Sequence, residues 1–95
     1  MKRLMFSTYT FKDRLDEGGY RELVKRFGEI GNAPGVLAHY VRLDGRGGFT
    51  ISEEIPGKES AVYETVLEYG SYINFESTPI AAIEDALPSI VKIFG

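Results

Sequence analysis

The stretch Val36–Ile55, VLAHYVRLDGRGGFTISEEI, decides the fold. Two β-rich runs, residues 36–43 and 48–55, flank the segment Asp44-Gly45-Arg46-Gly47. Asp-Gly between two such runs is a strong short-range signal for a β-hairpin. The stretch therefore predicts an antiparallel hairpin in which the glycines at 45, 47 and 48 serve the turn. They do not form a phosphate-binding loop, because no helix follows them.

A strand and a helix precede this hairpin. Residues 3–11 are rich in β-formers and predict a strand. The polar residues 12–19 predict a loop that runs into a helix, whose first turn carries Asp16 and Glu17. The helix is indicated by apolar residues at helical spacing, namely Tyr20, Leu23, Val24 and Phe27. The run GEIGNAPG at 28–35 predicts the end of that helix, with a glycine cap and a proline beyond it.

A second helix and strand follow the hairpin. Residues 58–69 resume helical spacing after Pro56-Gly57, and residues 72–78 alternate as a half-buried strand does. The order β-α-β-β-α-β predicts an α+β chain of the ferredoxin-like type, with both helices on one face of a four-stranded antiparallel sheet. With 95 residues, the chain is expected to form one domain over residues 1–95.

A third helix is expected at the C-terminus. Thr78-Pro79 is typical of an N-cap followed by proline at the first helical position. Pro88 is expected to kink the helix or to restart it near Ala86, which would divide it into two short pieces. Its apolar face is too wide to be left in water and consists of Ile83, Ala86, Leu87, Ile90, Val91 and Phe94.

The two faces of the sheet are predicted from the alternation in the last two strands. Phe49, Ile51, Ile73 and Phe75 are expected to pack under the helices. The open face is then expected to carry Thr50, Ser52, Glu54, Tyr72, Asn74 and Glu76. In the first two strands both phases carry large residues, so their orientation stays open. Apolar groups on both sides favour a second copy of the chain as the cover of the open face.

Composition excludes several kinds of chemistry. The chain has no cysteine and one histidine, His39, which excludes disulfides, thiolate metal sites and a two-histidine metal cage within one chain. We therefore expect neither a metal site nor a cofactor. The net charge of −3 argues against nucleic acid as a partner. No apolar run is long enough to span a membrane and no signal peptide is recognised, so a cytoplasmic location without membrane association is expected.

Three segments carry a resemblance to a known family. The run GNAPGV at 31–36, the turn DGRGGF at 44–49 and FESTP at 75–79 resemble an uncharacterised family, a domain of unknown function in the dimeric α/β-barrel superfamily. The likeness extends from the first strand through Pro79. It implies ferredoxin-like chains whose sheets pair face to face into a barrel, often with a ligand cavity in each protomer.

The relatives within that superfamily suggest possible activities. They include antibiotic-biosynthesis monooxygenases, which act without a cofactor, and haem-degrading monooxygenases. Family members often carry tryptophan before the last strand, whereas this chain has no tryptophan and offers Tyr63, Tyr69 and Tyr72 in that region. The resemblance implies the fold and the dimer, and it leaves open whether the chain is an enzyme.

Candidate site residues are few. His39 titrates nearest to neutral pH and is the first candidate for proton transfer or haem ligation; the alternative is a strand histidine hydrogen-bonded to a neighbour. Glu76 is the second catalytic candidate, since with Glu54 on the same poorly solvated face one carboxyl would have a raised pKa; the alternative is two solvated carboxylates. The candidate ligand-binding residues are Tyr9, Tyr40, Glu54, Tyr72 and Asn74.

Two functions of different classes follow. The first is a small homodimer that binds a small apolar or aromatic ligand in a cavity between the sheet and its partner, with cofactor-free monooxygenase-like chemistry as one use of that cavity. The alternative is a non-catalytic structural or regulatory dimerisation module. The twelve tyrosines and phenylalanines fit either function, because they can line a cavity or fill a core.

Overall fold

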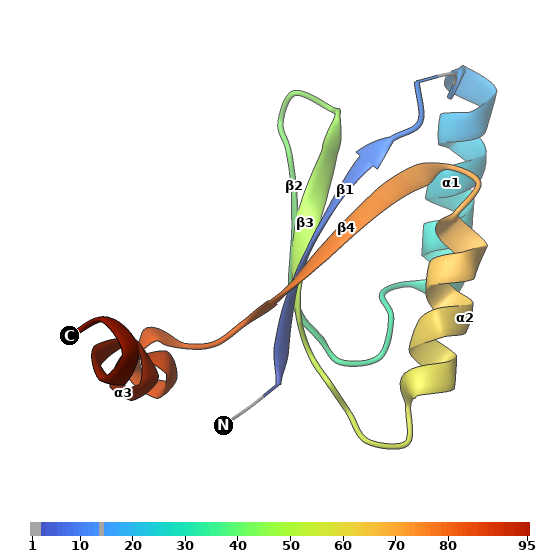
Figure 1. Cartoon of the computed structure of the whole chain (residues 1–95). Helices are drawn as coiled ribbons and strands as arrows, with labels where there is room; N and C mark the ends of the chain where they lie inside the picture. The colour runs from blue at the N-terminus through green and yellow to red at the C-terminus, as the bar shows by residue number, and fades with distance from the viewer. Residues whose placement is uncertain (1–2, 14) are drawn as a thin grey trace.

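A computed structural model describes residues 3–13 and 15–95 of the chain. The fold is α+β, with a four-stranded antiparallel sheet and three helices in the order β-α-β-β-α-β-α, as the sequence predicts (Figure 1). The elements are β1 (Leu4–Phe11), α1 (Glu17–Ile30), β2 (Val36–Val41), β3 (Gly47–Glu53), α2 (Glu59–Tyr69), β4 (Ile73–Ile80) and α3 (Ile83–Phe94).

The strands lie in the order β2-β3-β1-β4, so β1 is central and β2 and β4 form the edges. Strand β1 pairs with β3 on one side and with β4 on the other, in a register that sets Ser7 opposite both Thr50 and Ser77. Helices α1 and α2 both lie on the same side of this sheet (Figure 1). This is the element order of the ferredoxin-like motif.

The hairpin between β2 and β3 forms at the predicted place. Its turn is held by Asp44, whose Oδ1 accepts a hydrogen bond from the backbone N–H of Arg46 at 3.0 Å, and by an ion pair between Asp44 and Arg42. The hydrogen bond from Arg46 lowers the pKa of the Asp44 carboxyl. Gly45 has a φ of 75°, which glycine adopts without steric cost, and its N–H donates to the carbonyl of Arg42 at 3.1 Å. Gly47 and Gly48, by contrast, are buried residues of β3 and not part of the turn.

Helix α1 begins at Glu17, where the sequence predicts its first turn. The Asp16 side chain accepts a hydrogen bond from the backbone N–H of Gly19 at 2.7 Å, and this N-cap places the first helical residue at Glu17. At the other end, the N–H of Gly31 donates to the carbonyl of Phe27 at 2.8 Å. The predicted glycine cap is therefore Gly31, while Gly28 lies within the helix.

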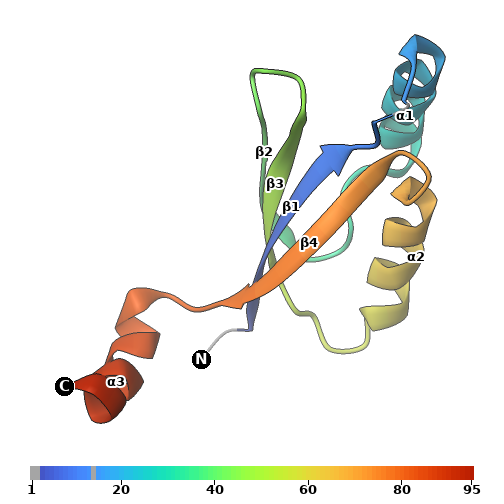
Figure 2. The same cartoon turned by 45° about the horizontal axis from the view of Figure 1, so that its top comes forward.

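The predicted start and division of the last helix are wrong. Thr78 and Pro79 belong to β4, where Pro79 lies opposite Met5 of β1. An edge strand tolerates proline, because a residue there can have its N–H side away from the sheet. Helix α3 begins at Ile83 and runs without interruption through Pro88 to Phe94. It lies apart from the rest of the chain, on the side of the sheet away from α1 and α2 (Figure 2).

The structure resolves the orientation of all four strands and corrects the prediction for β3. Ile73 and Phe75 face the helices as predicted, and Asn74 and Glu76 lie on the open face. Phe49 and Ile51 lie opposite Thr8 and Phe6 of β1 and share the open face with them, whereas Thr50 and Ser52 face the helices. Phe6, Tyr40 and Phe49 form an aromatic cluster there, with ring centroids 5.2 and 5.3 Å apart.

The two helices stand away from the sheet. Among the described residues, the only large hydrophobic side chains that are buried are Tyr69 and Ile73, each 7% exposed. The accessible surface is 7287 Å², against roughly 5,500 Å² for a compact monomer of this mass. The single chain therefore leaves much apolar surface in contact with water, on α3, on the open face and between the helices and the sheet.

Candidate functional site

A large cavity separates the helix pair from the sheet. Its volume is about 1260 Å³, above the ~300–1,000 Å³ of ordinary small-molecule sites. Its lining is predominantly apolar and comes from α1, α2 and the helix-facing side of all four strands. Six of the twelve aromatic residues line it, namely Tyr9, Phe11, Phe27, Tyr63, Tyr69 and Phe75. The cavity lies between the sheet and the chain's own helices, not between the sheet and a partner.

Within this apolar wall, three polar side chains form a hydrogen-bonded chain. The Tyr9 hydroxyl lies 2.7 Å from His39 Nε2, and His39 Nδ1 lies 2.9 Å from Asn32 Oδ1. All three residues line the cavity. They come from the central strand, from an edge strand and from the α1–β2 connection, so only the folded chain brings them together.

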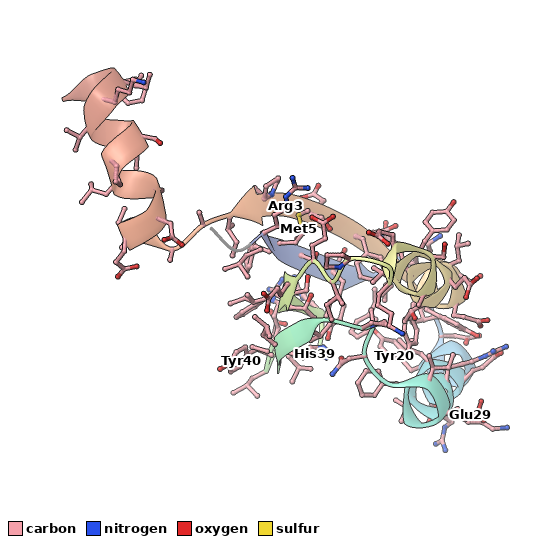
Figure 3. The ribbon with its side chains drawn as sticks, turned by 90° about the horizontal axis from the view of Figure 1, so that it is seen from below. Arg3, Met5, Tyr20, Glu29, His39 and Tyr40 are labelled. Carbon is pink, nitrogen blue, oxygen red and sulfur yellow. The ribbon has the colours of Figure 1, made fainter. Side chains whose placement is uncertain are left out.

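Local features of β2 and the loop before it place His39 in this chain. Strand β2 changes register between Val36 and Ala38, a β-bulge that turns both Val36 and His39 toward the helices. Figure 3 shows His39 and Tyr40 on opposite sides of β2. The loop that carries Asn32 is held in turn by Tyr69, whose hydroxyl donates to the carbonyl of Gly31 at 2.8 Å.

The ring of Tyr9 is enclosed by aromatic neighbours and by a glycine. It contacts His39 edge to face at 5.5 Å between centroids, and Phe11 and Phe75 at 6.1 and 6.3 Å. Across the β1–β3 ladder it lies opposite Gly48, where a Cβ would come within 2.6 Å of the Tyr9 hydroxyl oxygen. The absence of a side chain at Gly48 therefore makes room for the phenol.

Burial sets the charge of this chain of groups. It lowers the pKa of His39 and raises the pKa of Tyr9, so both side chains are held in their neutral forms. Because Asn32 Oδ1 is only an acceptor, Nδ1 of neutral His39 carries the proton and Nε2 has the free lone pair. The Tyr9 hydroxyl then donates to Nε2, and its oxygen is left as an acceptor at the cavity wall.

The lowered pKa of His39 makes stability depend on pH. The unfolded chain takes up a proton near the ordinary histidine pKa of about 6.5, whereas the folded chain does so only at lower pH. The stabilisation from neutral His39 is thus fully present above about pH 6.5 and is lost as the pH falls through the pKa of the folded state. We expect urea unfolding at several pH values to show this loss in the wild type and a shallower slope in His39→Gln. Equal slopes would contradict it.

The structure separates the other predicted site residues from this pair. Tyr9 and His39 meet in the cavity, while Tyr40, Asn74 and Glu76 lie on the opposite, open face. The predicted pairing of Glu54 with Glu76 is wrong, because Glu54 lines the cavity and forms an ion pair with Arg3 at 3.4 Å.

The prediction that Tyr72 lies on the open face is also wrong. It precedes β4, and its interaction with Glu22 of α1 raises the pKa of its phenol. That contact places the Tyr72 side chain beside α1, on the helical side of the sheet.

Sequence reasoning missed Asn32 and the role of Gly48. Asn32 lies in the run GNAPG, which signals only a chain reversal, and nothing in the spacing links it to His39 seven residues later. Gly48 begins the predicted β-rich run 48–55, but turn chemistry is the only role that the sequence suggests for its missing side chain. A signal did exist in the pair Gly47-Gly48 at the start of a β-rich run, since glycine within a strand often marks a close approach of another group.

Comparisons with family models, with curated proteins and with solved structures find no match to this chain. Among the residues that the structure describes, no three histidine, aspartate or glutamate side chains gather as metal ligands would. In the same part of the chain, no helix has the length and apolar character needed to cross a bilayer. What this site can bind is therefore inferred from the positions and chemistry of its residues.

Proposed function

We propose that this protein binds an apolar or aromatic small molecule in the cavity between its helix pair and its sheet. The observation that carries the proposal is the cavity itself, about 1260 Å³ with an apolar, aromatic lining and one polar group of three residues. Sites for small molecules have this composition, in which apolar walls give affinity and a few polar groups fix orientation. The monooxygenase-like activity implied by the resemblance stays a prediction.

The exposed apolar residues of the cavity lining also support the proposal that a ligand binds there. Val24 and Tyr63 line the cavity and are 70% and 65% exposed, although they lie on the helices that should cover the sheet. At ~25 cal/mol per Å², each 100 Å² of this lining that a ligand removes from water contributes about 2.5 kcal/mol before the entropy cost of binding. A flat aromatic molecule would fill the space that a monomeric core leaves empty.

Diphenylhexatriene, a neutral hydrocarbon that fluoresces in apolar surroundings, tests the proposal. We expect saturable binding to the wild type, and at least a ~10-fold weaker affinity for Val66→Trp, whose larger side chain occupies the cavity. Leu67→Trp is the matched control. Leu67 is the next residue of α2, is 58% exposed and does not line the cavity. The Leu67→Trp variant should therefore bind the probe within about twofold of the wild-type affinity.

The outcomes of this titration are distinct. Absence of saturable fluorescence with the wild type would overturn the proposal. Equal losses in both tryptophan variants would place the probe on the outer surface of α2 and would also contradict it. Circular dichroism of each variant separates loss of binding from loss of folding.

We also propose that the chain acts as a homodimer in which a second copy covers the open face of the sheet. The support is the apolar cluster of Phe6, Tyr40 and Phe49, which the chain's own helices leave uncovered. Helix α3 projects on that same side with its apolar face bare (Figure 1). Two sheets paired in this way would form the dimeric barrel that the resemblance implies.

A further inference from the structure

We infer that the cavity selects ligands that carry a hydrogen-bond donor, such as a phenol or an alcohol, and that the oxygen of Tyr9 receives this donor. The inference rests on the proposed function and names the class of molecule that the cavity takes. It follows from the direction in which the hydrogen bonds of Asn32, His39 and Tyr9 run.

The direction is fixed at Asn32. Oδ1 of Asn32 accepts from Nδ1–H of His39, so the neutral ring has only a lone pair at Nε2. That lone pair takes the single proton of the Tyr9 hydroxyl at 2.7 Å. Tyr9 then has no proton left to donate to a ligand. Its oxygen can still accept a hydrogen bond from one.

Among the residues that the structure describes, the surroundings of Tyr9 offer its oxygen no hydrogen-bond donor. In the described part of the chain, the phenolic oxygen has no hydrogen-bond partner besides His39, and the ring of Tyr9 packs near the rings of Phe11 and Phe75. A ligand that places an acceptor such as an ether or a carbonyl oxygen there would leave two acceptors facing each other without a proton. A ligand with an O–H group would satisfy both.

The packing around Tyr9 and His39 supports this orientation of their hydrogen bond. Gly48 lies directly opposite Tyr9 on β3, and the space above its Cα holds the phenol. The edge-to-face contact with His39, in turn braced by Phe27 at 5.7 Å, fixes the orientation of the imidazole. The Tyr9 oxygen is therefore already in place to accept a hydrogen bond before the ligand binds. A ligand with a donor loses little free energy to ordering this group.

Three naphthalene probes of nearly equal size test the inference: naphthol, its methyl ether and naphthaldehyde, each displacing diphenylhexatriene. We expect the wild type to bind naphthol about 10-fold more tightly than either acceptor probe, which is the order of magnitude for one hydrogen bond. Tyr9→Phe should lose this preference and keep its affinity for the methyl ether within about twofold.

A second variant tests the direction itself. Asn32→Ala frees the tautomer of His39, so that Nε2–H can donate to Tyr9 and the phenol can donate to a ligand. We expect this variant to fold, because Asn32 is exposed, and to bind naphthaldehyde with about the affinity it shows for naphthol. A purely structural role of Asn32 would lower all three affinities together.

The failures are distinguishable. If diphenylhexatriene does not bind, the proposed function itself is overturned. If it binds and the wild type takes the three naphthalene probes equally, the cavity remains a ligand site and the inference about its donor selectivity is overturned. An unchanged preference for naphthol in Asn32→Ala would show that Asn32 does not set the direction, and it too would overturn the inference.

Discussion

Replacing Gly47 by alanine is expected to destabilise the protein by about 3 kcal/mol or more, which is a large part of the ~5–14 kcal/mol available to a chain of this size. Gly47 is buried at the start of β3, with a φ of 155°, and a Cβ there would overlap the carbonyl oxygen of Tyr9. Because that oxygen belongs to the backbone of the central strand, it cannot move aside without separating β1 from β3.

The measurement is chemical and thermal unfolding. A loss of that size should lower Tm by roughly 12 °C or more, since each kcal/mol shifts Tm by about 4–8 °C in domains of this length. Gly28→Ala is the matched control. It lies in α1 with nothing within 4 Å of an added Cβ, and the gain in helix propensity should stabilise the chain by ~0.5–1 kcal/mol. Unchanged stability of Gly47→Ala would refute the close approach of the two strands.

This prediction also shows what the sequence could and could not reveal. The hairpin, the strand and helix order and the helix spacing follow from local signals, because Asp44-Gly45 and the apolar repeat act over a few residues. Whether Gly47 serves a turn or a strand is decided by Tyr9, which lies far away in the chain and meets β3 only after folding. The pair Gly47-Gly48 signals that some group approaches the strand closely, but the sequence does not say that this group is Tyr9.

The predicted orientation of β3 is wrong for a similar reason, while that of β4 is confirmed. Phe49 and Ile51 are apolar, so the sequence favours the helical side for them, yet the register with β1 puts them on the open face. A bulge at Val36/Ala38 inverts the alternation of β2, and a one-residue irregularity exchanges the two faces of a strand. Local composition thus predicts that a segment forms a strand. Which side of the sheet its side chains face depends on pairing with distant strands.

The site divides in the same way. His39 stood out because it is the only histidine, and Tyr9 was a candidate on the first strand. Their direct contact depends on the bulge and on the order β2-β3-β1-β4, in which β3 separates the two strands and contributes Gly48 between their side chains. Asn32 completes the chain from a connecting loop, a position where sequence periodicity carries no information.

The second large effect concerns assembly: we expect the wild type to sediment as a dimer at micromolar concentration, and Phe49→Asp and Leu87→Asp to raise the dimer Kd by about 100-fold or more. Phe49 lies in the aromatic cluster of the open face, and Leu87 lies on the apolar side of α3, where it is 48% exposed. A two-fold dimer buries each substitution twice, and an unpaired carboxylate in an apolar interface costs several kcal/mol.

An estimate of area explains why both surfaces are needed. Four strands at ~4.8 Å spacing, each about seven residues long, offer a face of roughly 450 Å², so two paired faces give only roughly 900 Å². Stable interfaces bury about 1,200–2,000 Å² in total. A twelve-residue helix is about 18 Å long and 10 Å wide, and two copies of α3 packed on partner surfaces add roughly 700 Å². The sum reaches the usual size only when α3 of each copy rests on the other.

Matched controls separate this interface from a general effect of added charge. Lys92→Asp changes the polar side of α3, and Gly28→Asp adds a carboxylate on α1, where nothing lies within 4 Å of an added Cβ. Both should remain dimers. Since α3 lies away from its own sheet, Leu87→Asp should weaken the dimer without lowering the stability of the dissociated chain (Figure 2). A wild type that sediments as a single chain would rule out the dimeric barrel. The proposal that a ligand binds between the helices and the sheet would not be affected, because that cavity needs no partner.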